Sequence, residues 1–383
     1  MIEEDASLFE RNRIEKNDKQ IRKKIRWVSG ILFYKIQTKI FTERHIYEMI
    51  QVLNFIWKVY PDQKIPVVID LGKTVFSEKL IYVLLENICY YMLYVRKQKI
   101  EILFSVEHTI WIEGIKFSPL RLLSDTRMYR KKYIDDIYMQ HFRRVVPALP
   151  QLNKDEYLSR LMEDICYFLK NNGVDEKSKN ELAEVLIELV GNALEHGRRE
   201  CLLDVDISRL YQKDGDDASY YGLNAVVLDY SDILFFQPLK EKMQLYKNLP
   251  ERYRFVSKAQ EYHLQHLTDD YLEEDFYTVS SFQHQISGDA RKKEAGGRGL
   301  TQLVYSLQER ADNHFCYIWS GNRMMRFEHD YMYYDDNKLI GFNQEKNYLS
   351  GVPDTNLFRT TMTFFPGTAY NLNFAIRKED IDD

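Results

Sequence analysis

The side chains best suited to chemistry lie in one stretch of the chain, ELVGNALEHG, residues 188–197. Glu188, Asn192, Glu195 and His196 are three or four residues apart, so on a helix they share one polar stripe. Leucine, valine and alanine supply most of the other positions and can cover the rest of that helix. An amide oxygen is a hard, neutral ligand that suits Mg²⁺, and a carboxylate one turn earlier can reach a water molecule beside a phosphate. Such a stripe either faces water or lines a pocket.

Three further features follow this helix, which is predicted over residues 176–196. The apolar strand in LNAVVLDY ends near Asp229, the glycine turn GGRGL at residues 296–300 opens a helix, and Gly367 and Thr368 lie between two predicted strands. Glycines free the backbone to turn N–H groups toward phosphate oxygens, and the positive end of a helix adds to the attraction. Taken singly, the glycine turn could be a helix cap and the Gly-Thr pair a hairpin turn.

The order of these four features resembles the GHKL superfamily of ATP-binding domains, which includes gyrase-type topoisomerases, histidine kinases, MutL-type repair proteins and anti-sigma serine kinases. The resemblance covers about residues 155–376. ELVGNALEHG is similar to the N-box of that family, in the form found in anti-sigma kinases and related bacterial ATPases. It implies that Asn192 holds Mg²⁺ against the phosphates and that Glu188 orients or deprotonates the attacking water or hydroxyl.

The resemblance also implies roles for the other three motifs. Asp229 matches the aspartate that accepts a hydrogen bond from the adenine amino group. The usual D-x-G-x-G following it reads DYSDI here, so Ser231 stands where the first glycine is expected. The implied catalytic residue is Glu188, and the implied cofactor-binding residues are Asn192, Glu195, His196, Asp229, Ser231, Gly297, Arg298, Gly299, Leu300 and Thr368, with Asn192 as the Mg²⁺ ligand.

The remaining sequence predicts a two-domain α+β or α/β protein. Residues 1–150 read as an N-terminal α/β domain, because KIPVVIDL and KIEILFSV are strand-like and flank a helical stretch, as in a parallel sheet. This unit loosely resembles STAS-type domains and would serve in regulation or interaction. Prolines at 147 and 150 place the boundary. Residues 151–383 would form a Bergerat-type ATP-binding sandwich, a mixed sheet with helices on one face, carrying a long helical lid insertion at about 235–292.

Two segments invite other interpretations. Residues 127–145 are basic and rich in tyrosine; a solvated helix between domains is the favoured interpretation, and nucleic-acid binding is the alternative. His263 and His266 are one turn apart, and a surface helix explains them better than a metal does, so no structural zinc is expected.

Composition limits the class of protein. The formal net charge is −5, from 53 basic and 58 acidic side chains, which favours neither nucleic acid nor an anionic membrane. The four cysteines are far apart in the chain, which fits a reducing compartment. The N-terminal residues are charged, and the longest apolar run, residues 80–95, is interrupted and short for a membrane span. We therefore expect a cytoplasmic protein without a membrane contact.

The motifs favour a regulatory protein that binds ATP and hydrolyses Mg-ATP to drive a conformational switch, in bacterial signalling or defence, together with a protein partner or as a homodimer. A histidine kinase is disfavoured, because the nearest match to its phospho-accepting motif, HFRRVVP from His141, lacks the acidic neighbour. Two alternatives stay open. One is a nucleotide-sensing or degenerate interaction module without turnover, which the altered adenine motif favours. The other is a protein serine kinase of the anti-sigma type.

Overall fold

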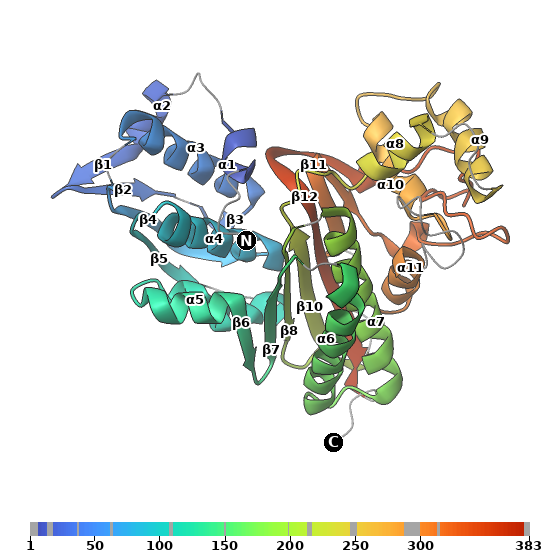
Figure 1. Ribbon diagram of the computed structural model, residues 1–383, viewed down its shortest axis with the longest axis horizontal. Coiled ribbons are helices and arrows are strands. Elements are labelled where there is room, and N and C mark those ends of the chain that lie inside the picture. Colours follow the sequence, from blue (N-terminus) through green and yellow to red (C-terminus); the bar gives the residue numbers. More distant parts are fainter. Residues whose placement is uncertain are drawn as a thin grey trace.

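The computed structural model describes residues 7–13, 18–36, 38–61, 64–106, 110–148, 151–197, 199–212, 217–245, 251–286, 299–311 and 315–378. Two β-sheets with helices packed against them make up this part of the chain (Figure 1). The predicted α+β class is confirmed. No helix among the described residues combines the length and the apolar character needed to cross a membrane.

The N-terminal sheet is mixed. Its strands are β1 (Ile25–Val28), β2 (Ile31–Lys35), β3 (Ile40–Phe41), β4 (Val67–Phe76) and β5 (Ile100–Val106). The β1–β2 hairpin is antiparallel, whereas β4 runs parallel to β2, β3 and β5. The predicted strand–helix–strand unit is confirmed as β4, α4 (Lys79–Tyr90) and β5, with a π-helical turn at Tyr91–Val95 ending the helix. Further helices of this half are α1 (Ser7–Arg11), α2 (Asp18–Lys24), α3 (Glu43–Val59) and α5 (Thr126–Ile134), with 3₁₀ turns at Ile110–Phe117 and Pro119–Leu122.

The second sheet has the order β11-β12-β10-β8-β7-β6, with β9 beside β10, and all of these pairings are antiparallel. Its strands are β6 (Asp135–Tyr138), β7 (His141–Val146), β8 (Cys201–Ile207), β9 (Tyr211–Gln212), β10 (Ser219–Asp229), β11 (Tyr317–Arg326) and β12 (Phe358–Arg377). The mixed sheet of the molecule is therefore the N-terminal one.

Helices cover one face of the second sheet, and the N-terminal half covers the other (Figure 1). The helices are α6 (Gln151–Asn171), α7 (Glu176–Asn192), whose last turn Ala193–Gly197 is π-helical, and α11 (Gly299–Arg310). Leu203 and Val205 of β8 pack on the helix side, whereas Leu202 joins the core of the N-terminal half. This alternation follows from the two-residue period of a strand. Helix α4 is buried on all sides because it lies between the two sheets.

The second sheet extends across the predicted boundary at residue 150. Strands β6 and β7 precede it, yet β7 pairs with β8 and both belong to the second sheet. The helix predicted over 127–145 is wrong beyond Ile134, where α5 ends and the hairpin begins. The segment is solvated on one side only, because Tyr129, Tyr133 and Arg143 are buried, whereas Arg130 and Lys131 are exposed. Arg143 is paired inside the protein, which local sequence patterns do not show.

The insertion between β10 and α11 is helical, as predicted. It contains α8 (Gln237–Leu245), a 3₁₀ turn at Glu251–Tyr253, α9 (Arg254–His263) and α10 (Glu273–Ser281); short 3₁₀ turns at His329–Tyr331 and Thr355–Leu357 lie between β11 and β12. His263 is buried and not on the surface: its ring nitrogens contact the Tyr271 hydroxyl at 2.6 Å and the Tyr348 carbonyl oxygen at 2.7 Å.

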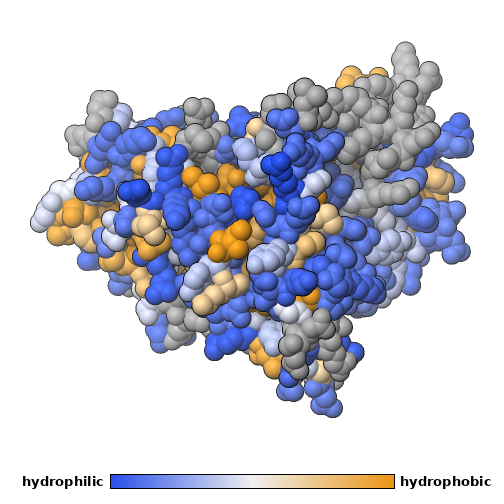
Figure 2. Space-filling view, turned by 60° about the horizontal axis from the view of Figure 1, so that its bottom comes forward, coloured by the Kyte–Doolittle hydropathy of each residue, from blue (hydrophilic) through white to orange (hydrophobic). Residues whose placement is uncertain are grey.

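The surface of the N-terminal half carries a groove along β5. Its volume is about 980 Å³, and its apolar lining includes Leu93, Ile100, Leu120 and Leu123. Seen from below, the mostly hydrophilic surface of the molecule shows apolar patches over this half, at the left of the view (Figure 2).

Candidate functional site

The polar stripe predicted from the sequence lies on α7 and its terminal turn. Asp175 caps this helix, because its carboxylate accepts hydrogen bonds from the backbone N–H groups of Lys177 and Ser178. Glu188, Asn192 and Glu195 are half-buried, in contrast to the buried apolar residues that face the sheet. The stripe is thus neither core nor freely solvated. The side chain of His196, a predicted cofactor-binding residue, lies outside the described residues.

Glu188 packs directly against the first residue of α11. A side-chain carbon added at Gly299 would overlap the Cγ and Cδ atoms of Glu188, so this contact requires glycine. The fold therefore brings the predicted catalytic carboxylate to the N-terminus of a helix more than a hundred residues later in the chain. Leu300 is half-buried against the core of the second sheet. Gly297 and Arg298 lie outside the described residues.

Glu195 is engaged by a cation that the sequence analysis missed. The Lys154 ammonium on α6 donates a hydrogen bond to the Gly191 carbonyl oxygen at 3.1 Å and lies 3.5 Å from Oε2 of Glu195. A cation is favourable there because helix carbonyl groups point toward it near the C-terminal end of α7. No motif marks Lys154, which is 41 positions before Glu195 in the sequence.

The second group of predicted residues meets at the ends of β10 and β12. Asp229 is buried at the last position of β10 and pairs with Thr368 in the strand register. Its Oδ1 accepts a hydrogen bond from the Ser231 N–H at 3.1 Å. Gly367 adopts a φ of 127°, and a side-chain carbon there would lie 2.8 Å from Oδ1 of Asp229 and 2.9 Å from the Ser231 nitrogen. Close backbone approach is therefore retained, but the glycine that permits it comes from β12.

One ion pair connects the two groups. Arg199, two residues after the last turn of α7, lies 3.6 Å from Asp232, whose φ is 47°. Both side chains are more than one-third exposed, so the pair contributes little to stability. The pair shows that the chain just after the last turn of α7 runs beside the turn that follows Asp229. Nothing in the spacing of these residues predicts the pair.

The groups next to Asp229 are poor nucleophiles. Burial raises the pKa of the Cys201 thiol well above its usual value, and the charge of Asp229 adds to this effect. The same two causes raise the pKa of the Tyr370 hydroxyl. Both groups therefore stay protonated at neutral pH, and the end of the sheet offers acceptors and backbone groups for binding.

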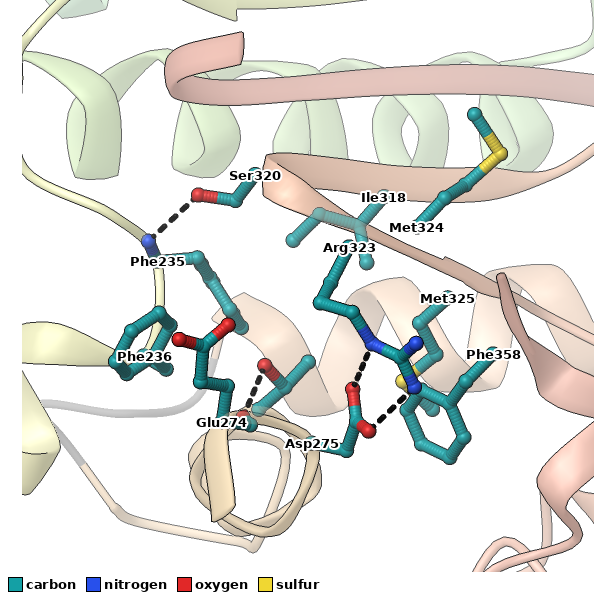
Figure 3. A pocket seen from close by; sticks show the side chains of 11 residues that line it. Phe235, Phe236, Glu274, Asp275, Ile318, Ser320, Arg323, Met324, Met325 and Phe358 are labelled. Atoms are coloured by element: carbon teal, nitrogen blue, oxygen red, sulfur yellow. Dashed lines mark hydrogen bonds and ion pairs between the residues drawn. The ribbon is translucent and has the colours of Figure 1, made fainter. Parts of the chain in front are cut away.

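The lid insertion is anchored on the second sheet beside this site (Figure 3). The Arg323 guanidinium of β11 donates two hydrogen bonds to the Asp275 carboxylate of α10, at 2.9 and 2.6 Å. The Phe235 N–H, at the start of the insertion, donates to the Ser320 hydroxyl at 2.9 Å. A small pocket separates these contacts and is lined by Phe236, Glu274, Ile318, Met324 and Phe358 among others.

No family model, curated protein or solved structure matches the chain. Its function is therefore argued from the contacts above and from the order of the motifs. Of the predicted residues, the fold brings Glu188 to Gly299 and Leu300, and it brings Asp229 and Ser231 to Thr368. Asn192 lies one turn after Glu188 on the same side of α7.

Proposed function

We propose that the chain binds Mg-ATP between α7, the start of α11 and the ends of β10 and β12, and that it hydrolyses ATP with Glu188 as the base. The contact between Glu188 and Gly299 carries this proposal. It sets a carboxylate beside the N-terminus of α11, where free N–H groups and the helix dipole favour phosphate oxygens. Such a carboxylate is in reach of a water molecule that attacks the γ-phosphate.

The residues present suit a nucleotide with Mg²⁺. Gly299 and Gly367 let the segments around the proposed site approach one another closely, because a side-chain carbon at these positions would overlap Glu188 and Asp229. The Asp229 carboxylate is an acceptor for the adenine amino group, whereas guanine would present a carbonyl oxygen to it. Asn192 would hold Mg²⁺, which offsets the charge on the phosphates.

In this proposal Glu188 orients the attacking water and takes its proton as the new bond to the γ-phosphorus forms and the bond to ADP breaks. The anchored insertion and the N-terminal half would then differ between the ATP and ADP states. A protein partner or a second copy of the chain would respond to that difference.

The decisive experiment compares phosphate release from Mg-ATP by the wild type, Glu188→Gln and Glu184→Gln. Glutamine keeps the shape of Glu188 but is no base, so we expect turnover to fall by about 10²–10⁴. Glu184 is exposed one turn earlier on α7, and its variant should match the wild type. Thermal unfolding with Mg-ATP reports binding separately, because a ligand at a hundred times its Kd stabilises the fold by about 2.7 kcal/mol.

The altered adenine motif favours a second candidate, a nucleotide sensor without turnover. Ser231 and Ile233 replace the two glycines of the motif, although Gly367 restores one close approach. For a sensor, Mg-ATP would raise the melting temperature while the wild type and Glu188→Gln release phosphate at the same background rate. If Mg-ATP does not shift the melting temperature of the wild type, both nucleotide functions are wrong.

A further inference from the structure

The residue after Asp229 is held by the N-terminal half of the molecule. Tyr230 is buried, and its side chain belongs to the N-terminal core, on the face of the second sheet opposite α6 and α7. Its hydroxyl accepts a hydrogen bond from Nδ2 of Asn87, on α4, at 2.7 Å. The turn that follows β10 is therefore fixed by a helix from more than a hundred residues earlier.

Helix α5 in turn fixes the orientation of the Asn87 amide. The Tyr133 hydroxyl donates a hydrogen bond to Oδ1 of Asn87 at 2.7 Å, so the amide donates on one side and accepts on the other. The Tyr133 ring stacks on Tyr90 of α4, with centroids 4.1 Å apart and planes inclined by 21°. All three side chains are buried, which leaves the amide little freedom to turn.

The Tyr230 ring also contacts the other strand of the proposed nucleotide site. Its centroid lies 5.2 Å from that of Phe365 on β12, two residues before Gly367. Asp229 and Ser231 flank Tyr230 in the chain, and Oδ1 of Asp229 and the backbone nitrogen of Ser231 lie beside Gly367. Tyr230 thus lies between the two segments that form the adenine end of the site.

Loss of the Asn87 contact would disturb this arrangement. The loss of a hydrogen bond by buried polar groups is costly, so the Tyr230 side chain would shift when the bond to Asn87 is removed. Because successive side chains of an extended chain point to opposite faces, a shift of Tyr230 turns Asp229 as well. The orientation of the Asp229 carboxylate therefore depends on α4 and α5.

We propose that Tyr230 is a positioning residue, through which Asn87 and Tyr133 hold Asp229 in the orientation that reads adenine. The N-terminal half then sets the base selectivity of the nucleotide site. This inference rests on the proposed function, since it assigns a regulator to the same site.

The test uses the full chain and measures the Kd values of Mg-ATP and Mg-GTP by calorimetry. The variants are Tyr230→Phe, Asn87→Leu and the two combined. Tyr129→Phe is the matched control, because the Tyr129 hydroxyl is equally buried on α5 but donates to the Glu86 carbonyl oxygen at 2.7 Å and not to Asn87. Melting temperatures without nucleotide report general damage to the fold.

We expect Tyr230→Phe and Asn87→Leu each to raise the Kd of Mg-ATP about fivefold, which corresponds to the loss of one hydrogen bond. The preference for ATP over GTP should fall by a similar factor, since guanine does not depend on the Asp229 orientation. The double variant should be no weaker than the stronger single one, because both remove the same contact. Tyr129→Phe should keep the wild-type preference.

Two results would overturn the inference while leaving the proposed function in place. One is that Tyr230→Phe and Asn87→Leu both keep the preference of the wild type for ATP over GTP. The other is an equal loss of ATP and GTP binding in all three single variants, in step with their melting temperatures, which would show a merely structural role. If the wild type binds neither nucleotide, the proposed function fails first and the inference fails with it.

Discussion

Single residues decide how closely the segments of the proposed site approach one another. Gly367 allows β12 to lie against Asp229 and Ser231, and Gly299 allows α11 to begin against Glu188. A motif can therefore lose its own glycine, as at Ser231, and keep the close approach through a glycine on the facing strand. Gly367 thus permits close packing of β12 on the turn after Asp229, while Ser231 and Ile233 still stand where the motif has glycines.

Gly299→Ala tests the Glu188 contact at this scale. The added methyl group would overlap the Glu188 side chain and displace its carboxylate. Misplacement of a reacting group by about 1 Å can cost roughly a hundredfold in rate, so we expect phosphate release to fall by that order. Gly191→Ala on α7 is the control, because its methyl group would meet only Cδ1 of Leu158 at 3.6 Å. The control should be fully active and more stable by about 0.5–1 kcal/mol. Equal activity of the two variants would contradict the assigned role of Glu188.

At the scale of elements, the sequence predicted the features that depend on residues close together in the chain. The Glu188 and Asn192 stripe, the β4–α4–β5 unit and the helical insertion follow from periodicity and composition. The hairpin β6–β7 did not, because its Arg143 is buried by ion pairs with the distant Glu86 and Asp204. For the same reason the sequence did not reveal Lys154 beside Glu195 or Asn87 beside Tyr230. Such contacts depend on the tertiary fold, which spacing along the chain does not encode.

Arg323 of β11 makes a cluster of hydrogen bonds that attach helix α10. Besides its two bonds to Asp275, Arg323 donates to the Thr360 hydroxyl at 2.7 Å and to the Asp270 carbonyl oxygen at 3.1 Å. This geometry uses the planar fork of a guanidinium, which a lysine ammonium does not have. One side chain thus makes several of the bonds that hold the insertion to the sheet.

We predict that Arg323→Lys loosens α10 without unfolding the protein. Loss of hydrogen bonds to a buried carboxylate costs about 1.5–3 kcal/mol, so amide exchange in residues 273–281 should accelerate by roughly tenfold or more. Hydrogen exchange with mass spectrometry measures this directly. Arg326→Lys, at an exposed position of the same strand, should leave α10 unchanged. Unaltered exchange of α10 in Arg323→Lys would show that other contacts hold the helix.

On the scale of the whole molecule, a buried set of charges joins the N-terminal half to the second sheet. Arg143 on β7 contacts both Glu86 on α4 and, at 2.5 Å, Asp204 on β8. Lys79 at the start of α4 contacts Asp204 at 2.5 Å and also Asp206. Burial would raise the pKa of Asp204, but these cations outweigh it and hold the pKa well below its usual value. Separating the two halves would break the Arg143–Glu86 pair and both pairs of Lys79, whereas Arg143 and Asp204 belong to the same sheet.

Arg143→Met should therefore be severely destabilising. It leaves the buried Glu86 without its cation and removes one of the two cations beside Asp204, a loss that costs about 3–5 kcal/mol. Urea unfolding followed by tryptophan fluorescence measures it, since Trp319 is buried in the same core. Arg144→Met is the control: Arg144 follows in the same strand and pairs with the more exposed Asp135 and Asp164, each at 3.3 Å, so the cost should be about 1 kcal/mol or less. Similar losses in the two variants would mean that the buried pairs do not hold the halves together.

His141 makes the stability of this junction depend on pH. Its Nδ1 lies 2.8 Å from Asp136 and its Nε2 lies 3.3 Å from Asp204, so both nitrogens face carboxylates. Burial and the charge of Lys79 oppose protonation, but the two carboxylates outweigh them and raise the pKa of His141. Lys132, 3.0 Å from Asp136, completes the set of neighbouring charges.

A histidine whose pKa is higher in the folded state stabilises the fold fully below its unfolded pKa of about 6.5, and this contribution disappears as pH rises through the folded value. We therefore expect the difference in unfolding free energy between the wild type and His141→Gln to be largest near pH 6. It should fall with rising pH by at most about 1.4 kcal/mol per unit, the limit for one proton, and then become constant. Urea unfolding of both proteins from pH 6 to 9 measures the difference, in which the titration of other groups cancels. A difference that stays constant over this range would show that His141 is neutral between its two carboxylates, and that the junction is held by Lys79 and Arg143 alone.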